Sequence, residues 1–210
     1  MKRWGLFFML LTLTGCSSGV NVEIPDEYYQ SSSKSMGYLT GSLAVTTVWP
    51  STGEGLETTL FLRKQGQKEP IILTNSTSPS HYQTEIIKGH IFSIELPTGH
   101  YELYSIKFRG SNGIKKVNSK TNDNLDIHFT IVDNNVTYLG QFLTSSLIAK
   151  SPLWNTQYPS GLGMIEHSNE GRRDKLLLNK YYPKLKGIPY SQEVIEGINN
   201  NKILATAVDL

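Results

Sequence analysis

The residues able to do chemistry are few and widely spaced. The chain has one cysteine, Cys16, and five histidines: His81, His90, His100, His128 and His167. Metal binding needs several histidines to converge, and scattered ones are more often isolated surface or turn residues. A single thiol has no partner in the chain for a disulfide. No P-loop, H-E-x-x-H or C-x-x-C motif is present, and the sequence predicts no catalytic residues, no metal site and no cofactor.

Three carboxylates provide an alternative in which the protein is an enzyme. Glu95, Glu102 and Asp126 lie on or beside alternating segments and would serve as acid and base in a hydrolase acting on glycan or peptide. The strand phases place Glu95 opposite its core neighbours and Glu102 on the face of Tyr104 and Ile106. The hydrolase hypothesis therefore needs these side chains to converge in one cleft.

The first sixteen residues read as a secretion signal. Lys2 and Arg3 precede an almost wholly apolar run over residues 4–13, and the small residues Thr14 and Gly15 lead to Cys16. A helix over residues 4–14 rises about 16 Å, against roughly 30 Å of bilayer hydrocarbon, so it is too short for a permanent membrane span. We expect residues 1–15 to be removed as a leader.

The run Leu13-Thr14-Gly15-Cys16 resembles the lipobox of bacterial lipoproteins. The resemblance implies that the Cys16 thiol receives a diacylglycerol, that the chain is cut before it, and that the new amino terminus is acylated. Several acyl chains anchor a protein stably to a membrane. Ser17 stands where an inner-membrane retention signal of the family usually has aspartate, which implies the outer membrane. The alternative is an ordinary signal peptide whose cysteine happens to lie near the cut.

Composition and charge indicate one domain with tails. The chain has 210 residues, of which 38% are hydrophobic and 18% charged. Removing Lys2 and Arg3 with the leader leaves 18 basic residues against 18 acidic ones, so the mature side chains are neutral overall. A nucleic-acid-binding domain is ordinarily basic, and the sequence predicts no such partner.

The chain divides into four parts. After the leader, residues 16–36 are rich in serine and predict a flexible tether, although Tyr28 and Tyr29 could instead dock this segment on the domain. Residues 37–150 are predicted to form a β-sandwich, and residues 151–210 a loop and helical extension. Gly19, inside the predicted tether, is expected to tolerate valine.

Short runs rich in β-branched and aromatic residues fill the central part and predict strands of an antiparallel sandwich. They cover residues 39–48, 58–63, 71–74, 82–87, 91–96, 101–108, 125–132 and 136–143. Pro97-Thr98-Gly99 joins two of these runs, and the reversal is expected to need a positive φ at Gly99, where valine would be strained. Residues 111–113 and 133–135 suit hairpins.

The segment Leu96-Pro97-Thr98-Gly99-His100-Tyr101-Glu102-Leu103 is similar to the L-P-x-G-x-Y-x-L corner of carboxypeptidase-regulatory-like and transthyretin-like sandwiches. Residues 136–140 are similar to a strand that often follows in lipoprotein versions. The resemblance covers roughly residues 37–145 and implies an Ig-like or transthyretin-like shape without an activity.

The C-terminal part changes character. It reads as loop over 151–166, with one more strand near 162–165, then a helix over 172–185 that Pro183 ends near Tyr182, and a second short helix over 191–199. Leu177, Tyr181 and Leu185 recur every four residues and are expected to cover the sandwich. The helical region has an excess of five positive charges, which either forms a solvated face or contacts anionic lipid or cell-wall polymer. The charged residues are Arg172, Arg173, Lys175, Lys180, Lys184 and Lys186 against Asp174.

These features predict a non-enzymatic, lipid-anchored protein of the bacterial outer membrane. Its sandwich would act as an interaction or structural module that docks another envelope component or the cell wall through loops or a strand edge. A narrower form of this hypothesis is a secretion-apparatus lipoprotein, because the type VI secretion lipoprotein has a similar sandwich and anchor. The envelope hydrolase remains the alternative.

Overall fold

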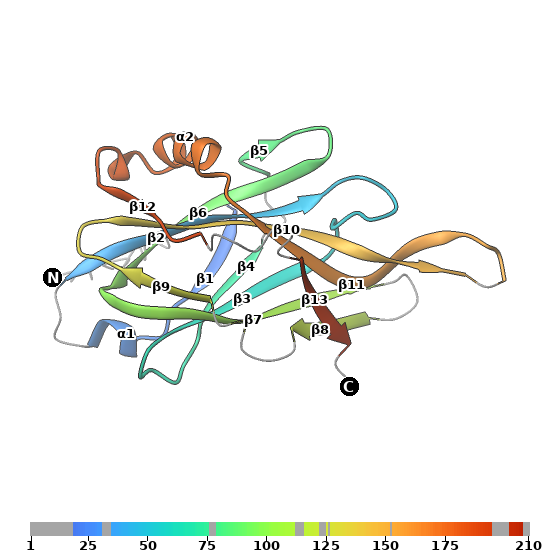
Figure 1. Cartoon of the computed structure of the whole chain (residues 1–210), viewed down its shortest axis with the longest axis horizontal. Helices are drawn as coiled ribbons and strands as arrows, with labels where there is room; N and C mark the ends of the chain where they lie inside the picture. Colours follow the sequence, from blue (N-terminus) through green and yellow to red (C-terminus); the bar gives the residue numbers. More distant parts are fainter. Residues whose placement is uncertain are drawn as a thin grey trace, which may run out of the picture.

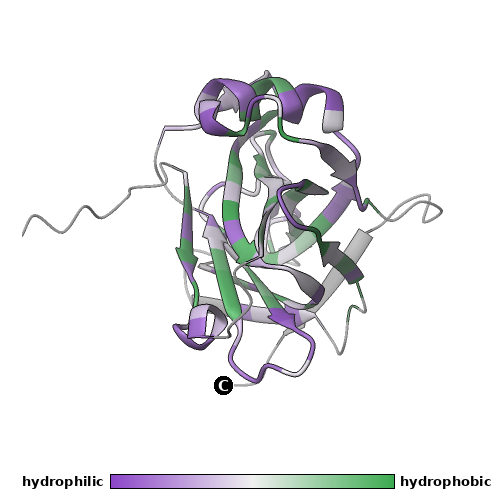
Figure 2. Cartoon of the chain, turned by 90° about the vertical axis from the view of Figure 1, so that its left-hand side faces the viewer, coloured by the Kyte–Doolittle hydropathy of each residue, from purple (hydrophilic) through white to green (hydrophobic). Residues whose placement is uncertain are grey.

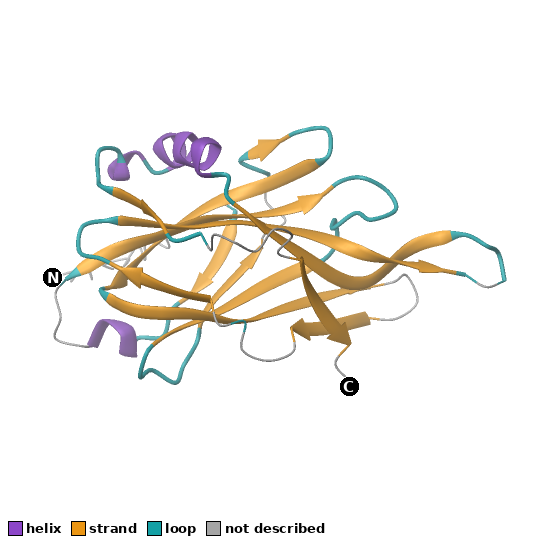
Figure 3. Ribbon diagram, viewed as in Figure 1, coloured by secondary structure: helices purple, strands orange, loops and turns teal. Residues whose placement is uncertain are grey.

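A computed structural model describes residues 19–30, 35–75, 79–111, 116–121, 125, 127–151, 153–194 and 202–207. Most of these residues lie in strands, which confirms a mainly β protein (Figures 1 and 3). The strands are β1 (Val20–Glu23), β2 (Met36–Thr46), β3 (Glu57–Lys64), β4 (Ile71–Asn75), β5 (Tyr82–Gln83), β6 (Ile87–Pro97), β7 (Gly99–Ser111), β8 (Lys116–Thr121), β9 (Ile127–Ile131), β10 (Val136–Lys150), β11 (Gln157–Ser168), β12 (Tyr190–Gln192) and β13 (Lys202–Ala207). The helices are α1 (Glu27–Gln30), α2 (Gly171–Tyr181) and the 3-10 turn η1 (Pro183–Leu185).

The strands form two sheets that are joined along one side. Sheet A has the order β1-β4-β3-β7-β8, with β9 also paired to β7. Sheet B has the order β11-β10-β2-β6-β5, with β12 also paired to β10. Strand β13 pairs with β8 and with β11 and so joins the sheets. Among the described strands, β10 runs parallel to β2 and β12, and every other pairing is antiparallel.

The core lies between the sheets because each strand points its apolar side chains to one face. Leu39 and Leu43 of β2 and Phe92 of β6 face Leu60 of β3 and Phe108 of β7 in one continuous cluster. Viewed along the molecule, the hydrophobic residues of the sheets surround this interior (Figure 2). The alternation in sequence identified the inward face of β6 correctly. The expectation that Glu102 shares a face with Ile106 is wrong, because a bulge in β7 brings both Leu103 and Ile106 into the core.

The segment predicted to be a tether is part of the folded body. It contains β1, which pairs with β4, and α1, which places Tyr28 at 1% exposure. The Tyr28 hydroxyl donates to the Glu69 carbonyl oxygen at 2.8 Å, and its ring stacks on Tyr101. A tether over 16–36 is thus wrong for residues 20–30, and the alternative of a docked Tyr28 is confirmed. The burial of one aromatic ring outweighs the polar composition around it.

Gly19 was expected to tolerate a side chain, but its surroundings leave no room for one. Its φ is +124°, and a Cβ there would lie 2.5 Å from Nδ1 of His90. The expectation that valine is neutral at this position is wrong, because both the backbone conformation and the packing favour glycine.

The connection Pro97-Thr98-Gly99 crosses between the sheets. It leads from β6 in sheet B to β7 in sheet A, and Gly99 has the expected positive φ, +143°. The Tyr101 hydroxyl donates to the Pro97 carbonyl oxygen at 2.7 Å and ties the corner together. The prediction of a hairpin at residues 133–135 is wrong. This segment crosses between the sheets as well, because it leads from β9 in sheet A to β10 in sheet B.

The predicted C-terminal extension mostly completes sheet B. Strand β10 continues to Lys150 and pairs with β11, so the predicted boundary at 150–151 falls inside a hairpin. The predicted strand over 82–87 shortens to β5, because residues 84–86 form a turn in which the Thr84 hydroxyl accepts from the backbone N–H of Ile87. Ser191 and Gln192 lie in β12 instead of a helix, and residues 195–199 of that predicted helix lie outside the described residues.

Helix α2 covers the outer face of sheet B, as its apolar stripe predicted. It ends at Tyr181, directly before Tyr182 and Pro183. Leu178 and Leu185 are buried against Ile91 of β6 and Val136 of β10 in a second, smaller cluster. Neither this helix nor α1, the α-helices of the described residues, has the length and hydropathy that a membrane crossing requires.

Candidate functional site

A β-bulge in β10 shapes the outer face of sheet B. Between Tyr138 and Gln141, β10 advances three residues while the paired strand β2 advances two, from Thr40 to Ser42. Gly140, in the bulge, has φ +108°. Residues three apart on a regular strand face opposite sides, but the bulge turns both Tyr138 and Gln141 outward beneath α2.

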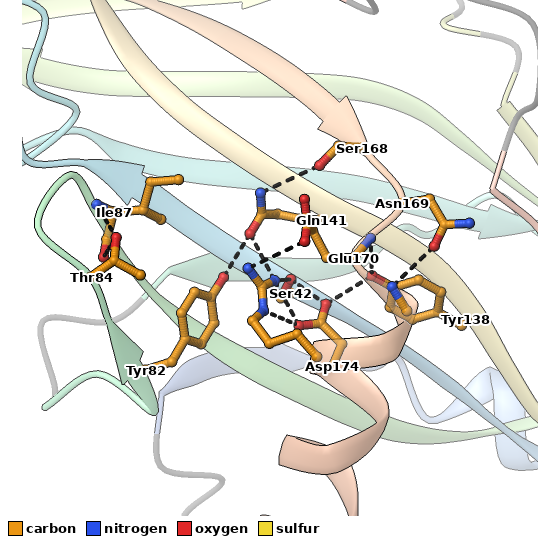
Figure 4. Close-up of polar contacts among 12 residues, drawn as sticks. Ser42, Tyr82, Thr84, Ile87, Tyr138, Gln141, Ser168, Asn169, Glu170 and Asp174 are labelled. Carbon is orange, nitrogen blue, oxygen red and sulfur yellow. Dashed lines mark hydrogen bonds and ion pairs between the residues drawn. The ribbon is translucent and has the colours of Figure 1, made fainter.

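A polar network lies in this space (Figure 4). The Asp174 carboxylate of α2 is 1% exposed and accepts hydrogen bonds from the Ser42 hydroxyl at 2.7 Å and the Tyr138 hydroxyl at 2.8 Å. The Arg173 guanidinium pairs with its second oxygen at 2.7 Å. The backbone N–H of Glu170, just before the helix, donates to the Tyr138 hydroxyl. The buried carboxylate is therefore fully partnered.

Arg173 and Gln141 extend the network to three strands. One of its terminal nitrogens donates to Oε1 of Gln141 at 2.8 Å, and its guanidinium lies 4.1 Å from the centre of the Tyr82 ring. The Tyr82 hydroxyl donates to the same Gln141 oxygen at 2.9 Å, while the Gln141 amide nitrogen donates to Ser168 at 3.4 Å. Arg173 thus connects α2 to β5 and β10, and Gln141 extends the network to β11.

The network is built to hold the helix rather than to move protons. Burial, and then the nearby Asp174 carboxylate, raise the pKa of Tyr138. Burial raises the pKa of Tyr82 to about 12. Both phenols stay protonated near neutral pH, and both already donate to a protein acceptor. The arrangement anchors α2 to sheet B with directional bonds.

The basic helical region therefore divides in two. Arg173 and Asp174 belong to the buried network, whereas Arg172, Lys184 and Lys186 are exposed. Lys175 and Lys180 lie over the rings of Tyr190 and Tyr181, at 4.9 and 5.0 Å. This arrangement fits a solvated face over an apolar stripe. Contact with lipid or cell wall stays a hypothesis.

The carboxylates of the hydrolase hypothesis are not brought together among the described residues. Glu95 is exposed on β6 of sheet B. Glu102 lies on β7 of sheet A, where it pairs with Nε of Arg63, whose guanidinium lies 4.7 Å from the Tyr104 ring. Asp126 lies outside the described residues.

The histidines fall into separate environments. His100 lies near the Thr130 hydroxyl, His128 is exposed, and His167 is buried with its Nε2–H donated to the Leu139 carbonyl oxygen at 2.7 Å. His81 and His90 are neighbours, with ring centres 5.3 Å apart. Within the described part of the chain, no three histidine, cysteine, aspartate or glutamate residues gather as a metal site.

His81 helps to cap the free edge of β6. Its Nδ1 accepts the backbone N–H of Ile91 at 3.1 Å, and the Tyr182 hydroxyl donates to the carbonyl oxygen of the same residue at 3.4 Å. Further along, the Tyr29 hydroxyl donates to the Glu95 carbonyl oxygen at 3.3 Å. An uncapped strand edge invites pairing with other chains, and these side chains occupy its backbone groups.

His90 makes stability depend on pH. It is 7% exposed, and burial, then His81 and Lys88, lower its pKa from 6.5 to about 4. Between these two values the folded state binds fewer protons than the unfolded state. The contribution of His90 to stability is therefore complete above pH 6.5 and is lost as the pH falls to about 4. We expect His90→Phe to reduce the difference in unfolding free energy between pH 7 and pH 4 by on the order of 2 kcal/mol in urea titrations.

The control for this prediction is His100→Phe, which changes an exposed histidine and should leave the pH dependence near that of the wild type. Equal pH dependence in His90→Phe and wild type would mean that His90 is already accessible to protons in the fold.

Large exposed apolar side chains gather at one end of the sandwich. We call this the hairpin end, and its residues are Val48, Trp49, Ile86, Ile148, Leu153, Trp154 and Tyr158. They come from the loop after β2, the β5–β6 turn and the β10–β11 hairpin. Backbone bonds join these segments: Thr47 N–H donates to the Ile86 oxygen at 2.9 Å, and Ser146 N–H to the Ser51 oxygen at 3.3 Å.

The hairpin projects beyond the rest of this end (Figure 1). At its tip Leu153 is 86% exposed and Trp154 79%. The tip is a closed turn, because Ser151 N–H donates to the Thr156 oxygen and Asn155 N–H to the Ser151 oxygen. The Ser151 hydroxyl also accepts the N–H of Trp154 at 3.3 Å. The two apolar side chains are therefore presented by an ordered loop, and the hairpin end is the candidate interaction site.

Sequence reasoning missed both sites and proposed Cys16, which lies outside the described residues. A signal for the tip existed in the sequence: Leu153-Trp154 lies between Pro152 and Asn155, so two large apolar side chains stand outside any predicted strand or helix. A signal for the network was the place of Asp174, four residues before the apolar Leu178.

The comparisons with known proteins add no family. No family model and no curated protein matches the chain. A solved structure of a leucine-rich repeat protein from Bacteroides thetaiotaomicron aligns with 15% identity and a TM-score of 0.28. The alignment covers 51% of this chain and 13% of the other.

Proposed function

We propose that this chain is a lipid-anchored protein of the bacterial outer membrane whose sandwich acts as a non-enzymatic interaction module. One observation carries the proposal: the motif Leu13-Thr14-Gly15-Cys16 comes shortly before Gly19, the first residue that the structure describes. In this proposal a leader, an acylated cysteine and a domain follow one another, and only Ser17 and Ser18 separate the cysteine from the first described residue. The sequence after Cys16 fits the outer membrane, because Ser17 replaces the aspartate of the retention signal.

The hairpin end supports the choice of an interaction module. Its exposed side chains include two tryptophans and a tyrosine, the residue types that are enriched both at protein interfaces and at the boundary of a membrane. They stand on three loops that the sandwich holds in place, which is how folds commonly carry binding residues.

We further propose that the sandwich is a variant of the Ig-like or transthyretin-like type. The bond from Tyr101 to the carbonyl oxygen four residues earlier supports it, because a tyrosine tied back to the preceding corner is a hallmark of Ig-like sandwiches. The two corner segments that cross between the sheets are also in keeping with a Greek-key sandwich.

The hydrolase alternative has less support. Retaining and inverting glycosidases hold their two carboxyl groups roughly 5–10 Å apart on one substrate. Glu95 and Glu102 stand in different sheets, and Glu102 is already paired with Arg63.

Replacing Cys16 tests the anchor. We expect wild-type protein to be labelled by a fatty-acid analogue in a bacterial host, and Cys16→Ser to remain an unlabelled precursor, because the thiol is the proposed attachment point. The double variant Cys16→Ser, Ser18→Cys is the matched control: it keeps one thiol but moves it out of the motif, and it should be unlabelled too. Equal labelling of Cys16→Ser and wild type would contradict the anchor.

A further inference from the structure

We propose that the tip of the β10–β11 hairpin inserts Leu153 and Trp154 into the interfacial layer of a lipid bilayer. The inference rests on the proposed function, because it takes the membrane that holds the Cys16 lipid as the surface that the tip meets.

The composition of the hairpin matches that layer. From residue 147 to residue 165 the chain has one charged residue, Lys150, and no acidic one. Tryptophan and tyrosine favour the boundary between headgroups and acyl chains, since one side of the ring is apolar and the other can meet water. Lys150 is exposed next to the tip and can keep its ammonium group among the headgroups while its stem lies along them.

The shape of the hairpin favours lipid over a protein partner. A stable protein interface needs roughly 20–30 residues on each side, arranged as a packed surface. The tip offers two strongly exposed apolar residues on a narrow, protruding turn. Such a tip fits between lipid headgroups more readily than it fills a protein interface.

The anchor places the body beside a bilayer. Ser17 and Ser18 are the residues between Cys16 and Gly19, and three extended residues reach about 10 Å at most. A body held this closely meets the surface at a high effective concentration, so even a weak interfacial contact becomes populated.

The test uses the mature chain from Ser17 onward, without lipid and with Trp49→Phe. Trp154 is then its one tryptophan, because Trp4 is removed with the leader. The probe is a set of phosphatidylethanolamine and phosphatidylglycerol vesicles, with and without bromine on the acyl chains. We expect Trp154 emission to shift to the blue with vesicles and to be quenched by the bromines. Unchanged emission at saturating lipid overturns the proposal.

A matched pair of substitutions locates the contact. Leu153→Asp should lower the vesicle partition coefficient by about tenfold or more, because a charge replaces the apolar side chain that enters the bilayer. Leu176→Asp, at a 69% exposed leucine on α2, should leave it unchanged. Equal loss in both variants, or a blue shift that follows protein concentration without lipid, assigns binding to another face or to a second copy and overturns the proposal.

The two proposals fail separately. Because the test protein lacks Cys16, its vesicle binding is independent of acylation. Fatty-acid labelling without vesicle binding would leave the anchor standing and remove the tip insertion. Vesicle binding without fatty-acid labelling would support the insertion of the tip and contradict the lipid anchor at Cys16.

Discussion

Asp174→Ala is expected to lower the free energy of unfolding by about 3–4 kcal/mol, a large share of the roughly 5–15 kcal/mol that keeps a domain folded. The substitution removes the acceptor of two buried hydroxyls, on Ser42 and Tyr138, and the partner of Arg173. Arg173 is partly exposed and can regain water, so the loss stays at the lower end for a broken buried ion pair. Urea titration of the mature chain measures it.

Two variants sharpen this result. Arg172→Ala changes the exposed neighbouring charge and should stay within about 0.5 kcal/mol of the wild type. Asp174→Asn keeps the shape but loses the charge and one acceptor oxygen, and we expect an intermediate loss. A stability of Asp174→Ala equal to that of Arg172→Ala would show that the network contributes little to holding α2.

Gly140→Val is expected to cost about 3–5 kcal/mol, through a strained backbone and a side chain with no room. The φ of +108° favours glycine, and a Cβ would lie 2.5 Å from Nε2 of His167 and 3.0 Å from the Ser168 carbonyl oxygen. The clash also displaces the bond from His167 to the Leu139 oxygen inside the bulge. Thermal and urea unfolding of the mature chain check the size of the loss.

Gly66→Val separates the two causes. Gly66 also has a positive φ, +86°, but nothing lies within 4 Å of its added Cβ. It should therefore show the backbone strain alone, about 1–2 kcal/mol. If both variants lose the same amount, crowding in the bulge has no cost and the bulge tolerates a side chain.

How much of the fold the sequence predicts depends on how regular each strand is. The alternation over residues 92–96 gave the inward face of β6 correctly, and Pro183 gave the end of α2. The alternation over residues 102–108 failed, because a bulge in β7 lets both Leu103 and Ile106 point inward. The strand predicted over residues 136–143 is shorter than β10, because the polar residues Thr144 and Ser146 break the alternation, although both are buried. Burial of a polar residue depends on partners elsewhere in the chain, as Thr144 shows by bonding Thr58.

The proline and glycine residues of β11 predict a loop over most of this strand. Gly163 has a packing reason that no local pattern contains: the ring of Phe108 takes the place where its Cβ would lie. The same holds for the buried network. Asp174 belongs by composition to a charged helix, and its partner Ser42 is 132 residues away. Sequence reveals such sites only where a charge interrupts an apolar stripe.

Strand β13 follows the other described strands in the chain, and this has a consequence for the order of folding. Among the described strands it is the one that pairs with both sheets, to β8 on one side and β11 on the other. A chain that leaves a ribosome or a translocation channel amino-terminus first makes β13 available after the strands that it joins. The parallel pair of β2 and β10 also joins residues about a hundred positions apart. Contacts between residues so distant form slowly, so sheet B is expected to assemble after the local hairpins, and β13 can close the seam only once β8 and β11 are in place.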